Sequence, residues 1–195
     1  PTGPIKQKVR LPNTPDTTIK LHCLDPNGIS PSGIPFRVSA AGNVIEMEPN
    51  DDHKTATPAA ECGMALNGVV GKDGDVDGFK FKGKKGQTFD IHCHARKLGS
   101  PLDSVMTLSV AGGGAVVAND DSGGPDSYFR YTFPDDREYV LSVTDHRGKG
   151  GPNYFYRVEF TPVAPVAVAS IPKVALYSQE RQTVTVPRGG RMAVL

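Results

Sequence analysis

Hydrophobic and polar residues alternate along much of the chain, which is typical of β-strands with one buried and one solvent-facing side. Phe89, Ile91 and Cys93 alternate with Asp90 and His92, and residues 106–110, 139–143 and 154–160 repeat the same period. No window of a dozen residues has a helical period. The pattern therefore predicts an all-β protein, built as an antiparallel β-sandwich.

The density of strand-like runs divides the chain into three predicted segments. Residues 42–163 have the strongest alternation and predict the main sandwich. Residues 1–41 predict the final strands of a preceding β-domain, at 5–11, 17–24 and 34–39. Residues 164–195 predict a linker and the first strands of a following β-domain, at 173–177 and 183–186. Because the chain begins at Pro1 without a signal peptide, we expect it to be part of a longer protein.

Charge and hydropathy argue against two classes of partner. The formal net charge is only +1, and the longest basic run is 82–85. Surfaces that bind nucleic acid or membranes need clustered positive charge, so we expect no nucleic acid partner. The longest apolar stretch, 163–171, contains Pro165 and is too short to span a bilayer. We therefore expect no membrane insertion.

The cysteines and the paired histidines do not predict a metal or redox centre. Cys23, Cys62 and Cys93 lack metal-site spacing, and three cysteines cannot all pair within the chain. Cys93 lies on the apolar side of its run and is interpreted as a small buried hydrophobe, while a Cys62–Cys93 disulfide stays open. His92 and His94 would face away from Cys93 on a strand, and we interpret them as surface residues.

Two acidic runs carry the chemistry that distinguishes this sequence. Asp73, Asp75 and Asp77 alternate and are followed by Gly78, like the first half of a calcium-binding loop. Lys84 stands where a helix-loop-helix calcium site needs glutamate, which excludes that class. The second run supplies further oxygen ligands on one side of an extended segment, from Glu46, Glu48 and Asn50, followed by Asp51. So many like charges repel one another unless a cation compensates them.

Several motifs together make the sequence resemble the bacterial pre-peptidase C-terminal domain. They begin with the 46–51 run and the segment from Gly71 to Phe81, and they continue with 98–104, 118–121 and 150–157. That family is a jelly-roll-like β-sandwich of secreted bacterial proteins, often beside peptidases, and is similar to the collagen-binding domain of clostridial collagenases. The resemblance implies calcium as the cofactor. Its implied ligands are Glu46, Glu48, Asn50, Asp51, Asp77 and either Asp75 or Asp73.

Three further expectations concern the flanking segments, collagen binding and a second acidic group. The flanking segments resemble Ig-like neighbours, so 1–41 and 164–195 are expected to be parts of such domains. The family's collagen-binding aromatic residues find no match here, so collagen binding is not inferred. A second acidic group is interpreted as turns rather than as another cation site. It consists of Asp103, Asn119, Asp120, Asp121 and Asp126.

The sequence contains no convincing catalytic motif, so we do not expect an enzyme. The run from Gly78 to Lys85 approaches a phosphate-binding loop but lacks its serine or threonine. The sequence instead favours a non-catalytic calcium-binding accessory module of a secreted or cell-surface multidomain bacterial protein. Its expected partners are neighbouring domains of the same chain and an extracellular protein or polysaccharide. The expected location is extracellular, cell surface or periplasmic. The alternative is a purely structural spacer in a surface fibre or envelope layer.

Overall fold

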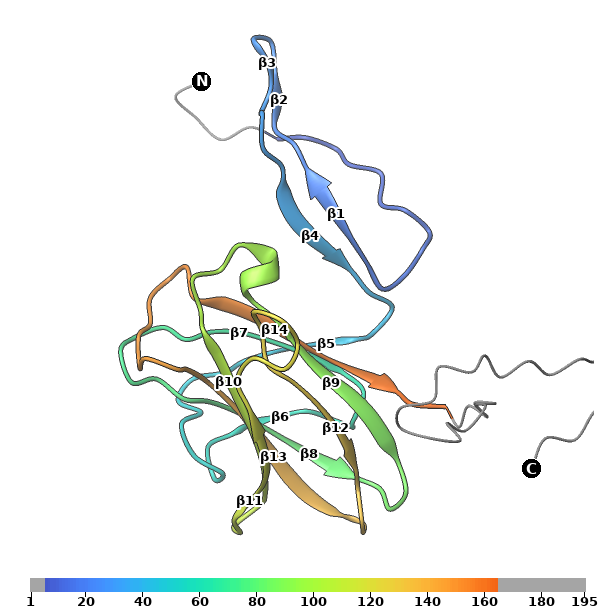
Figure 1. The fold of residues 1–195 in the computed structure, drawn as a ribbon, viewed down its shortest axis with the longest axis vertical. Coiled ribbons are helices and arrows are strands. Elements are labelled where there is room, and N and C mark those ends of the chain that lie inside the picture. The colour runs from blue at the N-terminus through green and yellow to red at the C-terminus, as the bar shows by residue number, and fades with distance from the viewer. Residues whose placement is uncertain (1–5, 165–195) are drawn as a thin grey trace, which may run out of the picture. The chain divides into compact units, whose positions relative to one another are not determined.

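The computed structural model describes residues 6–164, which form β-strands and one short 3-10 helix, η1 (Arg96–Leu98) (Figure 1). The all-β class predicted from the alternation is confirmed. The described strands belong to one compact unit, which ends at Val163. The strands predicted at 173–177 and 183–186 lie outside the described residues. Within the described range, no helix has the length and hydropathy needed to cross a membrane.

The N-terminal segment is a long hairpin. β1 (Thr17–Leu21) pairs antiparallel with β4 (Ile34–Val38), and β2 (Leu24–Asp25) pairs with β3 (Gly28–Ile29) at the tip. The described part of the strand predicted at 5–11 forms no strand, and all of its side chains are exposed. An alternating run without a surface to cover its apolar side gains little from an extended conformation, since strand preference is largely a matter of packing.

Ten strands between Asn43 and Pro162 form the two five-stranded sheets of the sandwich. The first, called here the β8 sheet, has the spatial order β11 (Ala115–Asn119), β10 (Ser104–Val110), β13 (Arg137–Asp145), β8 (Asp77–Gly83), β6 (Thr57–Pro58). The second, the β14 sheet, has the order β12 (Tyr128–Thr132), β9 (Thr88–His94), β14 (Phe155–Pro162), β7 (Ala65–Val69), β5 (Asn43–Ile45). Consecutive strands belong to opposite sheets, except β10 and β11, which pair with each other.

Most neighbouring strands of the sandwich pair antiparallel, as the sequence predicted, but two pairings at the sheet edges are parallel. β5 runs parallel to β7, with Asn43 opposite Ala65, and β6 runs parallel to β8, with Thr57 opposite Phe79. Alternation indicates which side of a strand is buried but says nothing about its direction, so sequence reasoning could not detect these pairs. Both short strands lie at sheet edges, and the segment that joins them reaches the start of β8.

The core lies between the two sheets and follows the predicted alternation. In β9, Phe89, Ile91 and Cys93 are buried while the intervening side chains are partly exposed. Aromatic rings from both sheets meet edge-to-face, as in the pair Phe81–Phe160, whose ring centroids are 5.3 Å apart. All three cysteines are thiols, and burial raises the pKa of Cys93 to about 12. Cys93 is thus the buried apolar residue that the sequence predicted.

Candidate metal site

Three carboxylates from the two acidic runs converge at one end of the sandwich. Glu46 directly follows β5, Glu48 lies in the loop after it, and Asp77 is the first residue of β8. One ligand oxygen from each residue lies within 4.8 Å of the other two. The parallel pairing of β5 with β7 continues into the site, because the N–H of Glu46 donates to the Asn67 carbonyl. The edge strand therefore positions a carboxylate against β8.

Buried polar groups without partners mark the centre of this cluster. Asp77 and Asn50 are both 0% exposed. Neither Asp77 oxygen, and neither side-chain polar atom of Asn50, has a hydrogen-bond partner among the described residues. Burial, together with the nearby Glu46 carboxylate, raises the pKa of Asp77 to about 9. Because buried polar atoms in native proteins are nearly always paired, these atoms point to a partner such as a cation.

The loop after β5 is tied to β8 through its backbone. The Asn50 N–H donates to a Glu48 carboxylate oxygen at 3.0 Å, and the Asn50 carbonyl accepts from the Gly78 N–H at 3.1 Å. A Cβ at position 78 would lie 2.7 Å from that carbonyl, so glycine is required for this approach. The Asp77-Gly78 pair, interpreted from the sequence as part of a calcium loop, thus supplies both a carboxylate and the space for the neighbouring segment.

Asp75 and Asp51 lie beside the three converging carboxylates. One Asp75 oxygen accepts the Gly71 N–H at 2.6 Å, and the other lies 3.4 Å from the Lys72 ammonium nitrogen. Burial raises the pKa of Glu48, and the charges of Asp75, Asp51 and Glu46 raise it further. The hydrogen bond from the Asn50 N–H lowers it but does not outweigh these effects. Asp75 is buried, whereas Asp51 is exposed. The charges of both residues act on Glu48, so both lie in the neighbourhood of the three carboxylates.

Asp73 differs from the other predicted ligands, because it is bound elsewhere. Its carboxylate lies 2.7 Å from the Lys149 ammonium and accepts the Gly150 N–H at 3.1 Å. These two contacts lower the pKa of Asp73. The sequence left Asp73 and Asp75 as alternatives, and the structure places the Asp75 carboxylate with the cluster and pairs Asp73 with Lys149.

Sequence reasoning missed two residues that shape the site, Tyr156 and Gly68. Tyr156 is buried, and its hydroxyl donates to Glu46 at 3.4 Å. Burial raises the pKa of Tyr156 well above its ordinary value. A Cβ at Gly68 would collide with both the Glu46 carboxylate and the Tyr156 hydroxyl. The alternation predicted that Tyr156 points inward, but nothing local indicated that its hydroxyl reaches an acid 110 residues away.

The second acidic group is bound within the protein, which supports its interpretation as turns. Asp126 is buried, and its carboxylate accepts the backbone N–H groups of Arg96 and Lys97. Asp103 pairs with the Arg96 guanidinium at 3.1 Å. Asn119 accepts backbone N–H groups across its turn, at 3.0 Å each. These three side chains therefore already have hydrogen-bond or ion-pair partners within the protein and do not need a cation to balance them.

The histidines contribute to the outer side of the β14 sheet rather than to a metal site. His92 stacks on Tyr128 with centroids 4.2 Å apart. The His94 side chain is only 16% exposed and lies 3.7 Å from the buried carboxylate of Glu159, so the prediction of a surface residue is wrong for His94. Arg37 of the hairpin makes a 2.6 Å ion pair with the same carboxylate.

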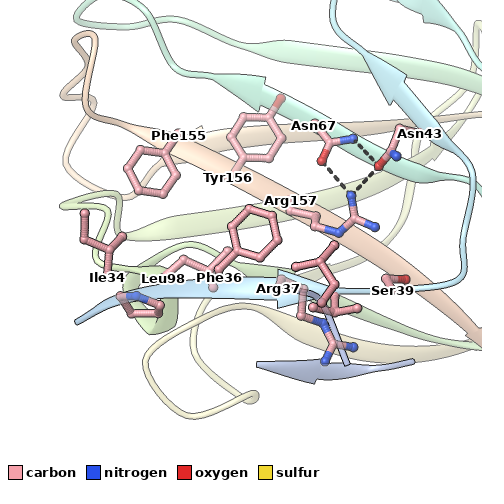
Figure 2. Close-up of a pocket in the computed structure, with 13 residues that line it drawn as sticks. Ile34, Phe36, Arg37, Ser39, Asn43, Asn67, Leu98, Phe155, Tyr156 and Arg157 are labelled. Carbon is pink, nitrogen blue, oxygen red and sulfur yellow. Dashed lines mark hydrogen bonds between the residues drawn. The ribbon is translucent and has the colours of Figure 1, made fainter. Parts of the chain in front are cut away.

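A groove of about 560 Å³ lies along β4, β14 and η1 (Figure 2). Figure 2 shows the rings of Phe36 and Phe155 in its apolar part and Arg157 hydrogen-bonded to Asn43 and Asn67. The Arg157 guanidinium also donates to Glu159 at 2.6 Å, so the polar end is internally paired. Among the described residues, the buried polar atoms without hydrogen-bond partners therefore lie in and beside the carboxylate cluster and not in this groove.

Comparisons with other proteins give partial similarities. No protein-family profile matches the chain. It is 39% identical over 99 residues to a probable subtilase-type serine protease of Deinococcus radiodurans. The matching region covers 50% of this chain but only 14% of that protein.

Solved structures with some similarity include a domain of the family that the motifs resemble. It is the pre-peptidase C-terminal domain of a Bacillus anthracis collagenase, with a TM-score of 0.43 and 14% identity over 54% of this chain and 94% of that one. Another is PliG of Aeromonas hydrophila, a periplasmic inhibitor of g-type lysozyme, with a TM-score of 0.44 and 16% identity over 63% of this chain and 100% of that one. The chain is thus similar to a pre-peptidase C-terminal domain and, over half its length, to a subtilase-type protease.

Proposed function

We propose that this chain is a non-catalytic accessory module that binds calcium through the carboxylate cluster. The observation that carries the proposal is the pair of buried, unpartnered side chains Asp77 and Asn50 beside two further carboxylates. Carboxylate and amide oxygens are the ligands that calcium prefers. Glu46, Glu48, Asn50 and Asp77 would hold the ion, with Asp75 and Asp51 adjacent. Asp73 is omitted from the proposed set because it pairs with Lys149.

The ion's role in this proposal is structural. It supplies positive charge where carboxylates from two separate chain segments meet. Those segments are the loop after β5, which follows the hairpin in the chain, and the start of β8. Calcium would therefore cross-link the entry of the sandwich to its core. Without it, burial first and the mutual repulsion of the carboxylates second disfavour the charged forms, which raises the pKa values of Glu48 and Asp77.

The proposed setting is a secreted or cell-surface multidomain bacterial protein that also carries a peptidase. The partial similarity to a subtilase-type protease supports this setting, since the matching region is a small part of a much longer chain. The partners would be neighbouring domains of the same chain and an extracellular protein or polysaccharide. The location would be extracellular, at the cell surface or periplasmic.

Thermal unfolding of the full chain in excess calcium and in excess chelator tests the proposal. A ligand that binds only the folded state adds about 2.7 kcal/mol at a hundredfold excess over its Kd. For a chain of this size we expect calcium to raise the Tm by about 5–10 °C. Glu48→Gln and Asp77→Asn should each lose most of this shift, because each removes a charged ligand.

The matched control is Asp121→Asn, which changes an exposed acid in the second acidic group. It should keep the whole calcium-induced shift. If the wild-type Tm does not respond to calcium, the proposal fails and the structural spacer becomes the better interpretation. A response that survives in both Glu48→Gln and Asp77→Asn would instead contradict the ligand assignment.

A further inference from the structure

Lys72 holds a positive charge beside Asp75, the buried acid adjacent to the proposed calcium ligands. Its ammonium nitrogen lies 3.4 Å from an oxygen of Asp75. The carboxylate of Asp75 acts most strongly on Lys72, and Asp51 and Glu48 add to it, so that the pKa of Lys72 is raised. Charges from both acidic runs therefore act on the same ammonium group.

The two members of the Lys72–Asp75 pair differ greatly in exposure. The Asp75 side chain is 3% exposed, whereas that of Lys72 is 68% exposed. One Asp75 oxygen is already engaged by the Gly71 N–H. The other oxygen has no hydrogen bond among the described residues, and Lys72 is the charged group beside it. Lys72 can therefore move into solvent at little cost, while Asp75 stays fixed and needs a positive neighbour.

We propose that Lys72 is a tethered competitor of calcium, which neutralises the site in the metal-free protein and must leave when the ion binds. This inference rests on the calcium site proposed above and adds a regulatory element to it. Because an ammonium group and a divalent ion repel each other, both cannot occupy the neighbourhood of Asp75. Lys72 would then raise the calcium concentration at which the site fills, while stabilising the fold at lower concentrations.

A second lysine pair provides a matched control. Lys149 lies 2.7 Å from Asp73, and both side chains are well exposed, at 60% and 63%. Asp73 has no part in the proposed ligand set, so removal of Lys149 should not affect calcium binding. The comparison of the two lysines separates competition at the site from a general effect of net charge.

Titration of the full chain with calcium chloride, followed by calorimetry, tests the proposal. Lys72→Met should bind calcium about two- to fivefold more tightly than wild type, the range expected from loss of one exposed ion pair. Lys72→Arg retains the charge and should bind like wild type, as should Lys149→Met. In chelator, Lys72→Met should have a lower Tm than wild type, because the carboxylates lose their counter-charge.

The opposite signs of the two effects of Lys72→Met are decisive. A lysine with a merely structural role would lower the Tm and leave the calcium affinity unchanged or weaker, and that result would overturn the proposal. An equal gain in affinity for Lys149→Met would overturn it too. If wild type and all variants fail to bind calcium, the proposed function itself has failed. If wild type binds and Lys72→Met binds equally well, only the competition is refuted.

Discussion

Gly68 is the residue on which the contact between Glu46 and Tyr156 depends. It lies in β7, where a Cβ would overlap both the carboxylate of Glu46 and the hydroxyl of Tyr156. Both groups belong to fixed parts of the sandwich, since Glu46 is also held by the Val69 N–H at 2.8 Å. The absence of a side chain at this position therefore allows an edge segment to place an acid above a buried tyrosine.

Gly68→Ala should destabilise the fold and also weaken the calcium response. Overpacking of this kind costs about 1–3 kcal/mol, and relief of the overlap must move Glu46 or Tyr156. Urea unfolding would measure the loss of free energy in chelator, and thermal melts would measure the calcium-induced shift. Gly114→Ala is the control, because a Cβ at that position would meet open space, with nothing within 4 Å. Equal behaviour of the two variants would show that the site does not depend on this contact.

Local sequence patterns predicted the candidate ligands but not the partners of the individual side chains. The two acidic runs were recognisable because oxygen-bearing side chains at every second position form a local pattern, and the resemblance to a family joined the runs. The partners that modify individual ligands are remote: Lys149 lies 76 residues from Asp73, and Tyr156 lies 110 residues from Glu46. No local pattern distinguishes Asp73 from Asp75. Only the fold shows that Asp73 is exposed and pairs with Lys149, whereas Asp75 is buried near Glu48 and lies beside Lys72.

Strands β4, β9 and β14 meet at a second group of charges on the outer side of the β14 sheet. Glu159 of β14 is buried and receives Arg37 from β4 and Arg157 from its own strand. His94 of β9 lies beside this carboxylate. Burial lowers the pKa of His94 to about 4, because desolvation and the charges of Arg37, His92 and Lys97 outweigh the attraction of Glu159.

This arrangement predicts a loss of stability in mild acid. The unfolded chain takes up a proton on His94 near pH 6.5, whereas the folded protein does not until about pH 4. Between these values the unfolded state binds more protons, so the free energy of unfolding falls as the pH falls. We expect a contribution of about 1–2 kcal/mol between pH 6.5 and pH 5. Burial also lowers the pKa of His92, which adds an effect of the same sign.

Urea unfolding at several pH values would measure this dependence. His94→Gln should reduce the slope between pH 6.5 and pH 5, because glutamine cannot take up the proton. His146→Gln is the control, since the His146 side chain is 57% exposed. An unchanged slope in His94→Gln would contradict the assignment. Burial would raise the pKa of Glu159, but its two arginine partners lower it overall. The stability that this charge contributes is therefore fully present above the unfolded value of 4.5 and is lost only as the pH falls below it, outside this window.

Individual strands were predictable from the sequence, but their partners were not. The alternating runs in β9, β10 and β13 correspond to observed strands, because each has one side in the core. The same pattern suits parallel and antiparallel neighbours alike, so the parallel edge strands β5 and β6 went undetected. Those two strands are also short, with three and two residues, and hold too little alternation to be recognised.

The sandwich as a whole takes its core from a limited part of the chain. The residues of the buried core cluster extend from Ala59 to Phe160 in the sequence. They therefore lie between the start of β5 and the end of β14. The last strand is indispensable to this core, because β14 lies between β9 and β7 in the middle of its sheet. The proposed ligands, from Glu46 to Asp77, lie between the start of β5 and the end of β14. The predicted module boundaries at 42 and 163 are consistent with this distribution and remain a prediction.

A chain that ends at Ala164 should therefore fold and respond to calcium like the full chain. All core residues and all proposed ligands are retained, together with the Val163 N–H that donates to Thr88 at 2.9 Å. We expect the Tm in chelator and in calcium to change by less than about 2 °C, in proportion to a free-energy difference below about 1 kcal/mol. A chain ending at Asn153 lacks β14 and should not unfold cooperatively, because it exposes the centre of the β14 sheet. A large fall in Tm for the chain ending at Ala164 would mean that residues 165–195 stabilise the sandwich, and the module would then need a later boundary.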